Sequence, residues 1–178
     1  MLETYKETDM IPLEQIEESE KCFGLLEQRV VTLLSEQNLH ICCAESCTGG
    51  LLSASLIHIS GASDVLNEGY ITYSNEAKHR LLGVREDTLA RFGAVSLQTA
   101  AQMASGVAAV AHAEIGIGVT GIAGPTGGTP EKPVGLVYIG IFCKGKVTVT
   151  ECHFSGDRLT VRQSSVKEAL ALLLRILE

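Results

Sequence analysis

The chain has 178 residues, of which 46% are apolar and 4% aromatic, and its formal net charge is −7. This length suits one domain with a single core, and the apolar fraction excludes global disorder. Residues 1–20 hold seven acids and one lysine, a balance of −6, so the rest of the chain is almost neutral and lacks the basic surface that nucleic-acid phosphates require.

The beginning of the chain predicts its compartment and its domain organisation. Acids stand where a secretory signal peptide has basic residues, and no apolar run approaches the roughly 18 residues that a membrane span needs. We therefore expect a cytoplasmic protein with an acidic extension over residues 1–20 and one domain over 21–178. The six cysteines form no C-x-x-C pair, so we expect free thiols and no metal site.

Apolar periodicity and capping residues predict the elements in chain order. Helices are expected over 13–36, from Leu51, from Asn75 as N-cap to Gly83, from Ser96 as N-cap, and over 158–177. Strands are expected over 40–44, 65–73, 115–119, 136–143 and 147–154. The alternation of helices with strands, and the hairpin late in the chain, predict a single-domain α/β/α sandwich with a mixed sheet.

One motif resembles a cofactor site without its structural context. Gly116-x-Gly118-x-x-Gly121 matches the dinucleotide fingerprint as a string, but these glycines lie inside an apolar run, and the residues that follow cannot form a helix. We expect no dinucleotide here and no cofactor elsewhere.

The segment AESCTGG predicts a nucleophile at Ser46. A serine in a tight turn between strand and helix is lifted clear of the sheet, and the N–H groups of the turn and the helix start point outward. Those of Cys47, Thr48, Gly49 and Gly50 are then placed to hold an oxyanion or a phosphate. In the alternative interpretation, Ser46 or Thr48 merely caps the helix and the glycines shape the turn.

A serine hydroxyl needs a base before it can attack an amide, and we expect Lys78 to be that base. None of the five histidines lies in a loop typical of an active site. Lys78 falls in the first turn of its helix, where the helix dipole and partial burial would lower its pKa and favour the neutral amine. Tyr73, just before that helix, is expected to orient the lysine, relay a proton or donate to the oxyanion. Alternatively, Lys78 is a solvated surface lysine.

The loop GVTGIAGPTGGTP is the third element of the predicted site. Its glycines permit backbone angles that aim several N–H groups at one anion, and Thr120 and Thr126 offer hydroxyls. A phosphate-bearing substrate would fit such a loop. The alternative is an ordinary surface loop.

Several of these motifs, in this order, resemble the C-terminal domain of the CinA family. They are ESCTGG at 45–50, GYITYSNEAK at 69–78, LLGV at 81–84, FGAVS at 92–96 and GVTGIAGPTGG at 118–128. The resemblance covers roughly residues 22–175. The family includes stand-alone nicotinamide mononucleotide deamidases.

The resemblance implies hydrolysis of the nicotinamide carboxamide, which yields nicotinate mononucleotide and ammonia in pyridine-nucleotide salvage. It implies that Ser46 is the nucleophile and that Tyr73 and Lys78 assist it. The Thr120–Pro125 loop, with Gly121 and Gly124, is expected to hold the nucleotide, and Arg158 or Arg162 to meet its phosphate. We also expect a homo-oligomer, since closed homo-oligomers are common.

Two other functions remain open at this point. One is a non-catalytic nucleotide- or partner-binding module linked to competence or DNA damage, which would bind without releasing ammonia. The other is an amidase for a different substrate.

Overall fold

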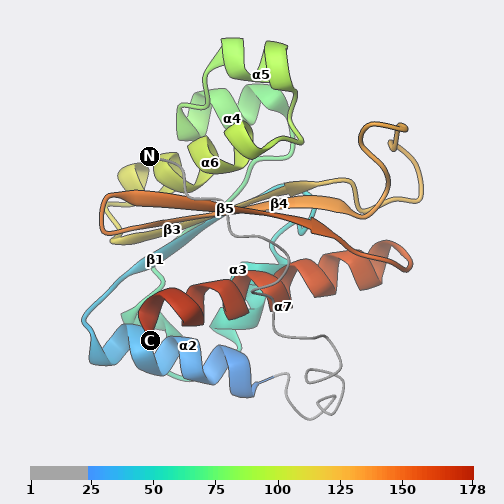
Figure 1. Ribbon diagram of the computed structural model, residues 1–178. Coiled ribbons are helices and arrows are strands. Elements are labelled where there is room, and N and C mark those ends of the chain that lie inside the picture. The colour runs from blue at the N-terminus through green and yellow to red at the C-terminus, as the bar shows by residue number, and fades with distance from the viewer. Residues whose placement is uncertain (1–23) are drawn as a thin grey trace.

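The computed structural model describes residues 24–178, so the acidic extension and the first half of the helix expected from residue 13 lie outside the described residues. A five-stranded sheet crosses the middle of the molecule in the order β2-β1-β3-β4-β5 (Figure 1). β1 pairs in parallel with β2 and with β3, whereas β4 pairs antiparallel with β3 and with β5. Their bounds are Ile41–Glu45 (β1), Gly69–Ile71 (β2), Ile115–Gly121 (β3), Leu136–Cys143 (β4) and Lys146–His153 (β5).

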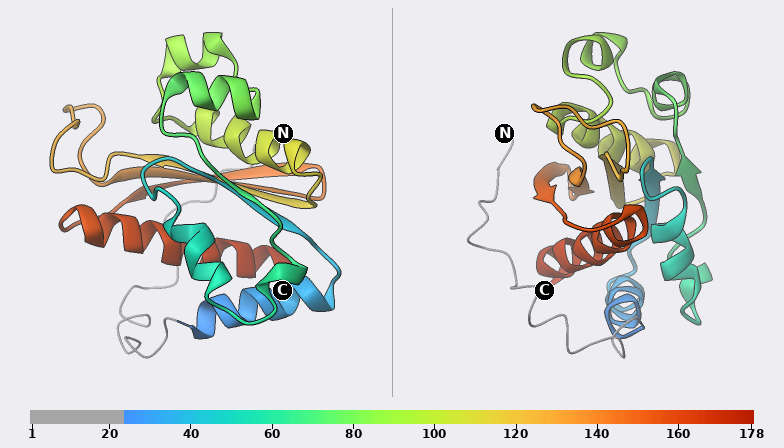
Figure 2. Two further views of the ribbon diagram at one scale, coloured as in Figure 1. Left: turned by 180° about the vertical axis from the view of Figure 1, so that it is seen from behind. Right: turned by 90° about the vertical axis from the view of Figure 1, so that its right-hand side faces the viewer.

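Helices cover both faces of the sheet, which confirms the predicted α/β/α sandwich (Figures 1 and 2). One layer consists of α2 (Leu25–Glu36), α3 (Leu51–Ile57) and α7 (Arg158–Leu177). The other consists of α4 (Asn75–Leu82), α5 (Glu86–Phe92) and α6 (Leu97–Val110). None of these described helices combines the length and the apolar character needed to cross a membrane.

Glycines of the sheet let α6 lie unusually close to it. A Cβ atom on Gly116 would come within 2.1 Å of the Ala104 carbonyl oxygen, and one on Gly118 or Gly140 within 2.7 or 2.5 Å of the Ala100 carbonyl oxygen. The glycines that resemble a dinucleotide fingerprint therefore lie inside β3, where Gly116 and Gly118 serve helix–sheet packing.

Three elements differ from expectation. Ser74, not Asn75, is the N-cap of α4, because its backbone is extended and its hydroxyl accepts from the Ala77 N–H. The strand expected over 65–73 shrinks to β2, since the N–H groups of Val65 and Leu66 bond back to the Ala62 carbonyl in a short turn. The helix α5 was not predicted. The last helix, the hairpin and the buried first strand lie where they were expected, within a residue or two.

Candidate active site

Ser46 follows the last residue of β1, the strand that lies between β2 and β3. Its N–H donates to the Val119 carbonyl oxygen at 3.0 Å and so continues the pairing of β1 with β3. The chain then turns through Gly49 and Gly50, at φ +60° and +94°, into α3. Only 8% of Ser46 is exposed, so the residue is buried.

Lys78 reaches Ser46 from the opposite helix layer. Its Nζ donates to Ser46 Oγ at 3.1 Å, and the side chain is fully buried. Burial lowers the pKa of Lys78 from 10.5 to about 8, because the ammonium loses its hydration. The interpretation of Lys78 as a solvated surface lysine is therefore wrong.

Two main-chain carbonyl groups orient the lysine. Nζ lies 2.7 Å from the Thr72 carbonyl oxygen and 3.5 Å from that of Tyr73. A neutral amine has two N–H bonds and one lone pair. When the two N–H groups of the neutral amine donate to the Thr72 and Tyr73 carbonyl oxygens, its lone pair points toward Ser46 and can accept the hydroxyl proton.

The side chain of Tyr73 does not perform the orienting role that we expected. Tyr73 is 66% exposed, and its hydroxyl oxygen accepts from Arg158 Nη2 at 3.4 Å. The contact to Lys78 is made by the Tyr73 carbonyl instead. The Tyr73 hydroxyl thus points toward the start of α7.

The buried carboxylate of Glu45 is a site feature that sequence reasoning missed. It accepts from the N–H groups of Gly50, Leu52 and Ser53 at 2.9, 3.0 and 2.8 Å, and from Ser53 Oγ at 2.6 Å. The expectation that Gly50 and the α3 terminus offer free donors to a substrate is therefore wrong. A signal was present, since a glutamate at the end of an otherwise apolar strand calls for internal partners.

The remaining N–H groups of the turn stay available. Those of Cys47, Thr48 and Gly49 meet no acceptor oxygen among the described residues. No side chain of the turn caps α3, whose N-cap is Gly50, so the alternative role of Ser46 or Thr48 as a helix cap is also wrong. The turn thus places a hydroxyl, and N–H donors that bond no oxygen, beside a base, as an acyl-transfer site requires.

Residues of the Gly/Pro loop have more varied roles than expected. The buried Thr120 hydroxyl donates to the Ala94 carbonyl oxygen at 2.8 Å, so its proton is not free for a phosphate. Gly121 ends β3 against the backbone of β4. Lys132, which the sequence reasoning did not select, anchors the loop by donating to the Phe92 and Val95 carbonyl oxygens, both at 2.6 Å.

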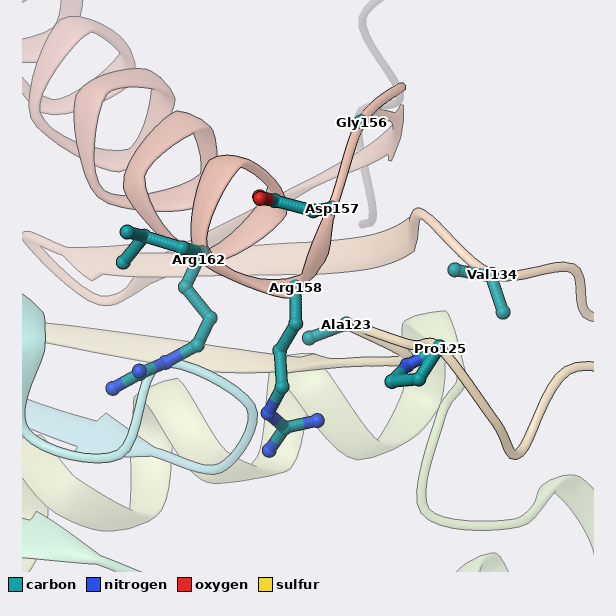
Figure 3. A pocket seen from close by; sticks show the side chains of 8 residues that line it. Ala123, Pro125, Val134, Gly156, Asp157, Arg158 and Arg162 are labelled. Carbon is teal, nitrogen blue, oxygen red and sulfur yellow. The ribbon is translucent and has the colours of Figure 1, made fainter.

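A pocket of about 440 Å³ lies between this loop and the first turn of α7. It is lined by Ala123, Pro125, Val134, Gly156, Asp157, Arg158, Leu159 and Arg162. Figure 3 shows the Arg158 and Arg162 side chains leaving α7 on the same side. Arg158 Nη1 donates to the Gly124 carbonyl oxygen and Arg162 Nη2 to that of Thr48, at 2.8 and 2.7 Å. Arg162 therefore connects the pocket to the turn that carries Ser46.

The family model of the CinA C-terminal domain matches residues 25–177, nearly all of the described chain. The chain belongs to this family. Among curated relatives, a CinA-like protein of Kosmotoga olearia is 52% identical over 152 residues, covering 85% of this chain and 37% of its own length. A putative competence-damage inducible protein of Clostridium novyi is 56% identical over 150 residues, covering 84% of this chain and 36% of its own length. The chain thus spans little more than a third of these relatives.

Solved structures match the CinA domain over almost their whole length. A competence/damage inducible protein of Agrobacterium tumefaciens is 42% identical with a TM-score of 0.85, over 88% of this chain and 96% of that one. A CinA superfamily protein of Escherichia coli is 32% identical with a TM-score of 0.84, over 97% and 93%. The CinA domain seen here is therefore a fold that also occurs alone in crystals.

Proposed function

We propose that this CinA domain hydrolyses the carboxamide of nicotinamide mononucleotide to nicotinate mononucleotide and ammonia. The observation that carries the proposal is the 3.1 Å contact between Ser46 Oγ and the buried Lys78 Nζ. A pKa of about 8 leaves a useful fraction of this lysine neutral near pH 7, as a general base requires.

In the first half of the reaction, neutral Lys78 accepts the Ser46 proton while Ser46 Oγ attacks the carboxamide carbon. The carbonyl oxygen becomes an oxyanion, and the N–H groups of Cys47, Thr48 and Gly49 stabilise it. Each such donor contributes about 3 kcal/mol in acyl transfer. The Thr72 and Tyr73 carbonyl oxygens meanwhile stabilise the new ammonium on Lys78.

In the second half, the Lys78 ammonium gives its proton to the departing nitrogen, and the carbon–nitrogen bond breaks to release ammonia. The acyl group is then an ester on Ser46. Water attacks this ester as Lys78 takes its proton, and the ester bond breaks with return of a proton to Ser46 Oγ. The cycle needs no group beyond this chain and water.

The pocket beside α7 supports a nucleotide as the substrate. Both arginines, Arg158 and Arg162, line this pocket, and Arg162 also contacts the Ser46 turn through the Thr48 carbonyl oxygen. In this scheme the phosphate binds beside these arginines and the carboxamide end extends to Ser46. Arginine is suited to phosphate because its planar group offers several donors. In this scheme Arg162 has a second role, since it also holds the Thr48 carbonyl oxygen. A cytoplasmic location and a homo-oligomeric state are proposed with the activity.

Ammonia release from nicotinamide mononucleotide, measured with a metal chelator present, tests the proposal. We expect turnover by the wild type and none by Ser46→Ala or Lys78→Ala, with Lys146→Ala as a control for loss of an exposed lysine. Circular dichroism must show that the inactive variants are folded. An active, folded Ser46→Ala protein would refute the mechanism.

The same assay separates the other functions. A wild type that binds the nucleotide without releasing ammonia is a binding module, in line with the competence-damage names of its relatives. Ammonia release from another carboxamide but not from this one would keep the mechanism and change the substrate.

A further inference from the structure

Glu45 directly precedes Ser46, yet the proposed reaction gives it no step. Its side chain is fully buried, which is costly for a carboxylate unless hydrogen bonds replace its hydration. All four of its hydrogen bonds come from the start of α3, three from backbone N–H groups and one from the Ser53 hydroxyl. In the described part of the chain, no lysine or arginine pairs with it.

These bonds close the loop that carries the nucleophile. Residues 46–49 connect the end of β1, at Glu45, to the N-cap of α3, at Gly50. The Gly50 N–H donates to Glu45 Oε2 at 2.9 Å. One side chain thus holds together the two ends of the loop. The Cys47, Thr48 and Gly49 N–H groups lie between these ends, as does Ser46 Oγ.

Other contacts hold the loop from outside without closing it. The Val119 carbonyl accepts from the Ser46 N–H, and Arg162 donates to the Thr48 carbonyl oxygen. Each fixes one point of the loop to a neighbouring element. The Glu45 carboxylate, by contrast, joins the end of β1 directly to the start of α3.

We propose that Glu45 is a positioning residue, which holds Ser46 and the N–H groups of Cys47, Thr48 and Gly49 in the geometry for attack and oxyanion binding. It acts through the loop and touches no substrate. The inference rests on the proposed function only in requiring that Ser46 is an acylated nucleophile. It predicts that loss of the carboxylate slows acylation more than it weakens substrate binding, because a misplacement of about 1 Å can cost 100-fold in rate.

The test variant is Glu45→Gln, which keeps the size of the side chain. One carboxylate oxygen is replaced by an NH2 group, which donates and cannot accept from the N–H groups of α3. Part of the hydrogen bonding that closes the loop is therefore lost. The matched control is Glu27→Gln. Glu27 is likewise a buried acid at a helix start, where it accepts from the Gly24 N–H at 2.8 Å, but it caps α2 and belongs to no part of the site. Ser53→Ala removes only one of the four donors.

Two measurements are made well below the melting temperature of each variant. The first is kcat and KM for ammonia release, and the second is the rate at which a fluorophosphonate labels Ser46, followed by mass spectrometry. We expect Glu45→Gln to lower kcat and the labelling rate on the order of 10- to 100-fold, with KM within about threefold of wild type. Ser53→Ala should have a smaller effect, and Glu27→Gln should change neither rate.

Wild-type kcat and labelling in Glu45→Gln would overturn the proposal, as would a rise in KM alone or an equal loss of rate in Glu27→Gln. If the wild type is labelled at Ser46 but releases no ammonia from nicotinamide mononucleotide, the proposed substrate fails while labelling still decides the role of Glu45. A wild type that is not labelled at Ser46 overturns both.

Discussion

Lys78 Nζ lies 3.1 Å from Ser46 Oγ, although 32 positions of the chain separate the two residues. The pairing of β2 with β1 brings them together, because β2 leads directly into α4 and the Thr72 N–H bonds to the Glu45 carbonyl oxygen at 2.8 Å. A shift of one residue in this register would turn the side chains of β2 to the other face of the sheet and break the bond from the Thr72 N–H to the Glu45 carbonyl oxygen. The short edge strand β2 therefore decides whether the nucleophile meets its base.

The pH dependence of the reaction should follow Lys78. The pKa of this residue is lowered to about 8, and the neutral amine is the active form. We expect kcat/KM to rise about tenfold per pH unit below pH 8 and to level off above it, because the neutral fraction grows in that way. A pH profile of ammonia release checks this, with buffer controls. A profile that is flat between pH 6 and about 9 would show that another group is the base.

The burial of Lys78 should reduce the stability of the fold. A pKa lowered from 10.5 to about 8 corresponds to a penalty on the order of 3 kcal/mol for the folded ammonium. We expect Lys78→Met to be inactive but more stable than wild type at pH 7, by about 1 to 3 kcal/mol in urea unfolding.

The advantage of Lys78→Met should shrink as pH rises from about 8 to 10.5. Over this range the folded wild type has lost the proton and the unfolded chain still binds it, so the free energy of unfolding of the wild type increases with pH. Below pH 8 both states are protonated and the penalty is constant. An advantage that does not change between pH 8 and 10 would contradict the assignment.

Gly106 on α6 should tolerate no side chain. A Cβ there would lie 2.0 Å from the Leu82 carbonyl oxygen at the end of α4. We expect Gly106→Ala to destabilise the domain by roughly 1 to 3 kcal/mol or more, since two backbones would have to separate. Thermal unfolding measures this, with Ala109→Ser as a control at an exposed position of the same helix. Equal melting temperatures would mean that α4 and α6 are not packed this closely.

Lys132 should set the position of the loop that lines the pocket. Its ammonium bridges the Phe92 and Val95 carbonyl oxygens, and Lys132→Met would leave both without this donor. We expect a loss of about 1 to 2 kcal/mol in stability and a higher KM for the nucleotide, with kcat nearly unchanged. Lys132→Arg keeps the charge and should recover part of both. A fall in kcat at constant KM would contradict a role confined to the pocket.

Much of the fold follows from local patterns. The apolar run before Glu45 predicts β1, the hairpin is marked by Lys144-Gly145-Lys146, and the amphipathic pattern over 158–177 predicts α7. The strand predicted over 65–73 is longer than the observed β2, because apolar residues indicate burial and the sequence does not distinguish a buried turn from a buried strand. The misplaced cap at Asn75 has a similar cause, since Ser74 is as good a capping residue and only backbone angles select between them.

For the site, the sequence by itself determined the chemical groups: a serine in a strand-to-helix turn, a lysine in a helix start and a glycine-rich loop. Only the tertiary structure decided which groups meet. It turned the Tyr73 phenol toward Arg158, placed the Tyr73 carbonyl on Lys78, and gave the α3 donors to Glu45. The reason is physical. Residue type limits what a group can donate or accept, whereas its partner is whichever group the packing of distant elements brings within about 3 Å.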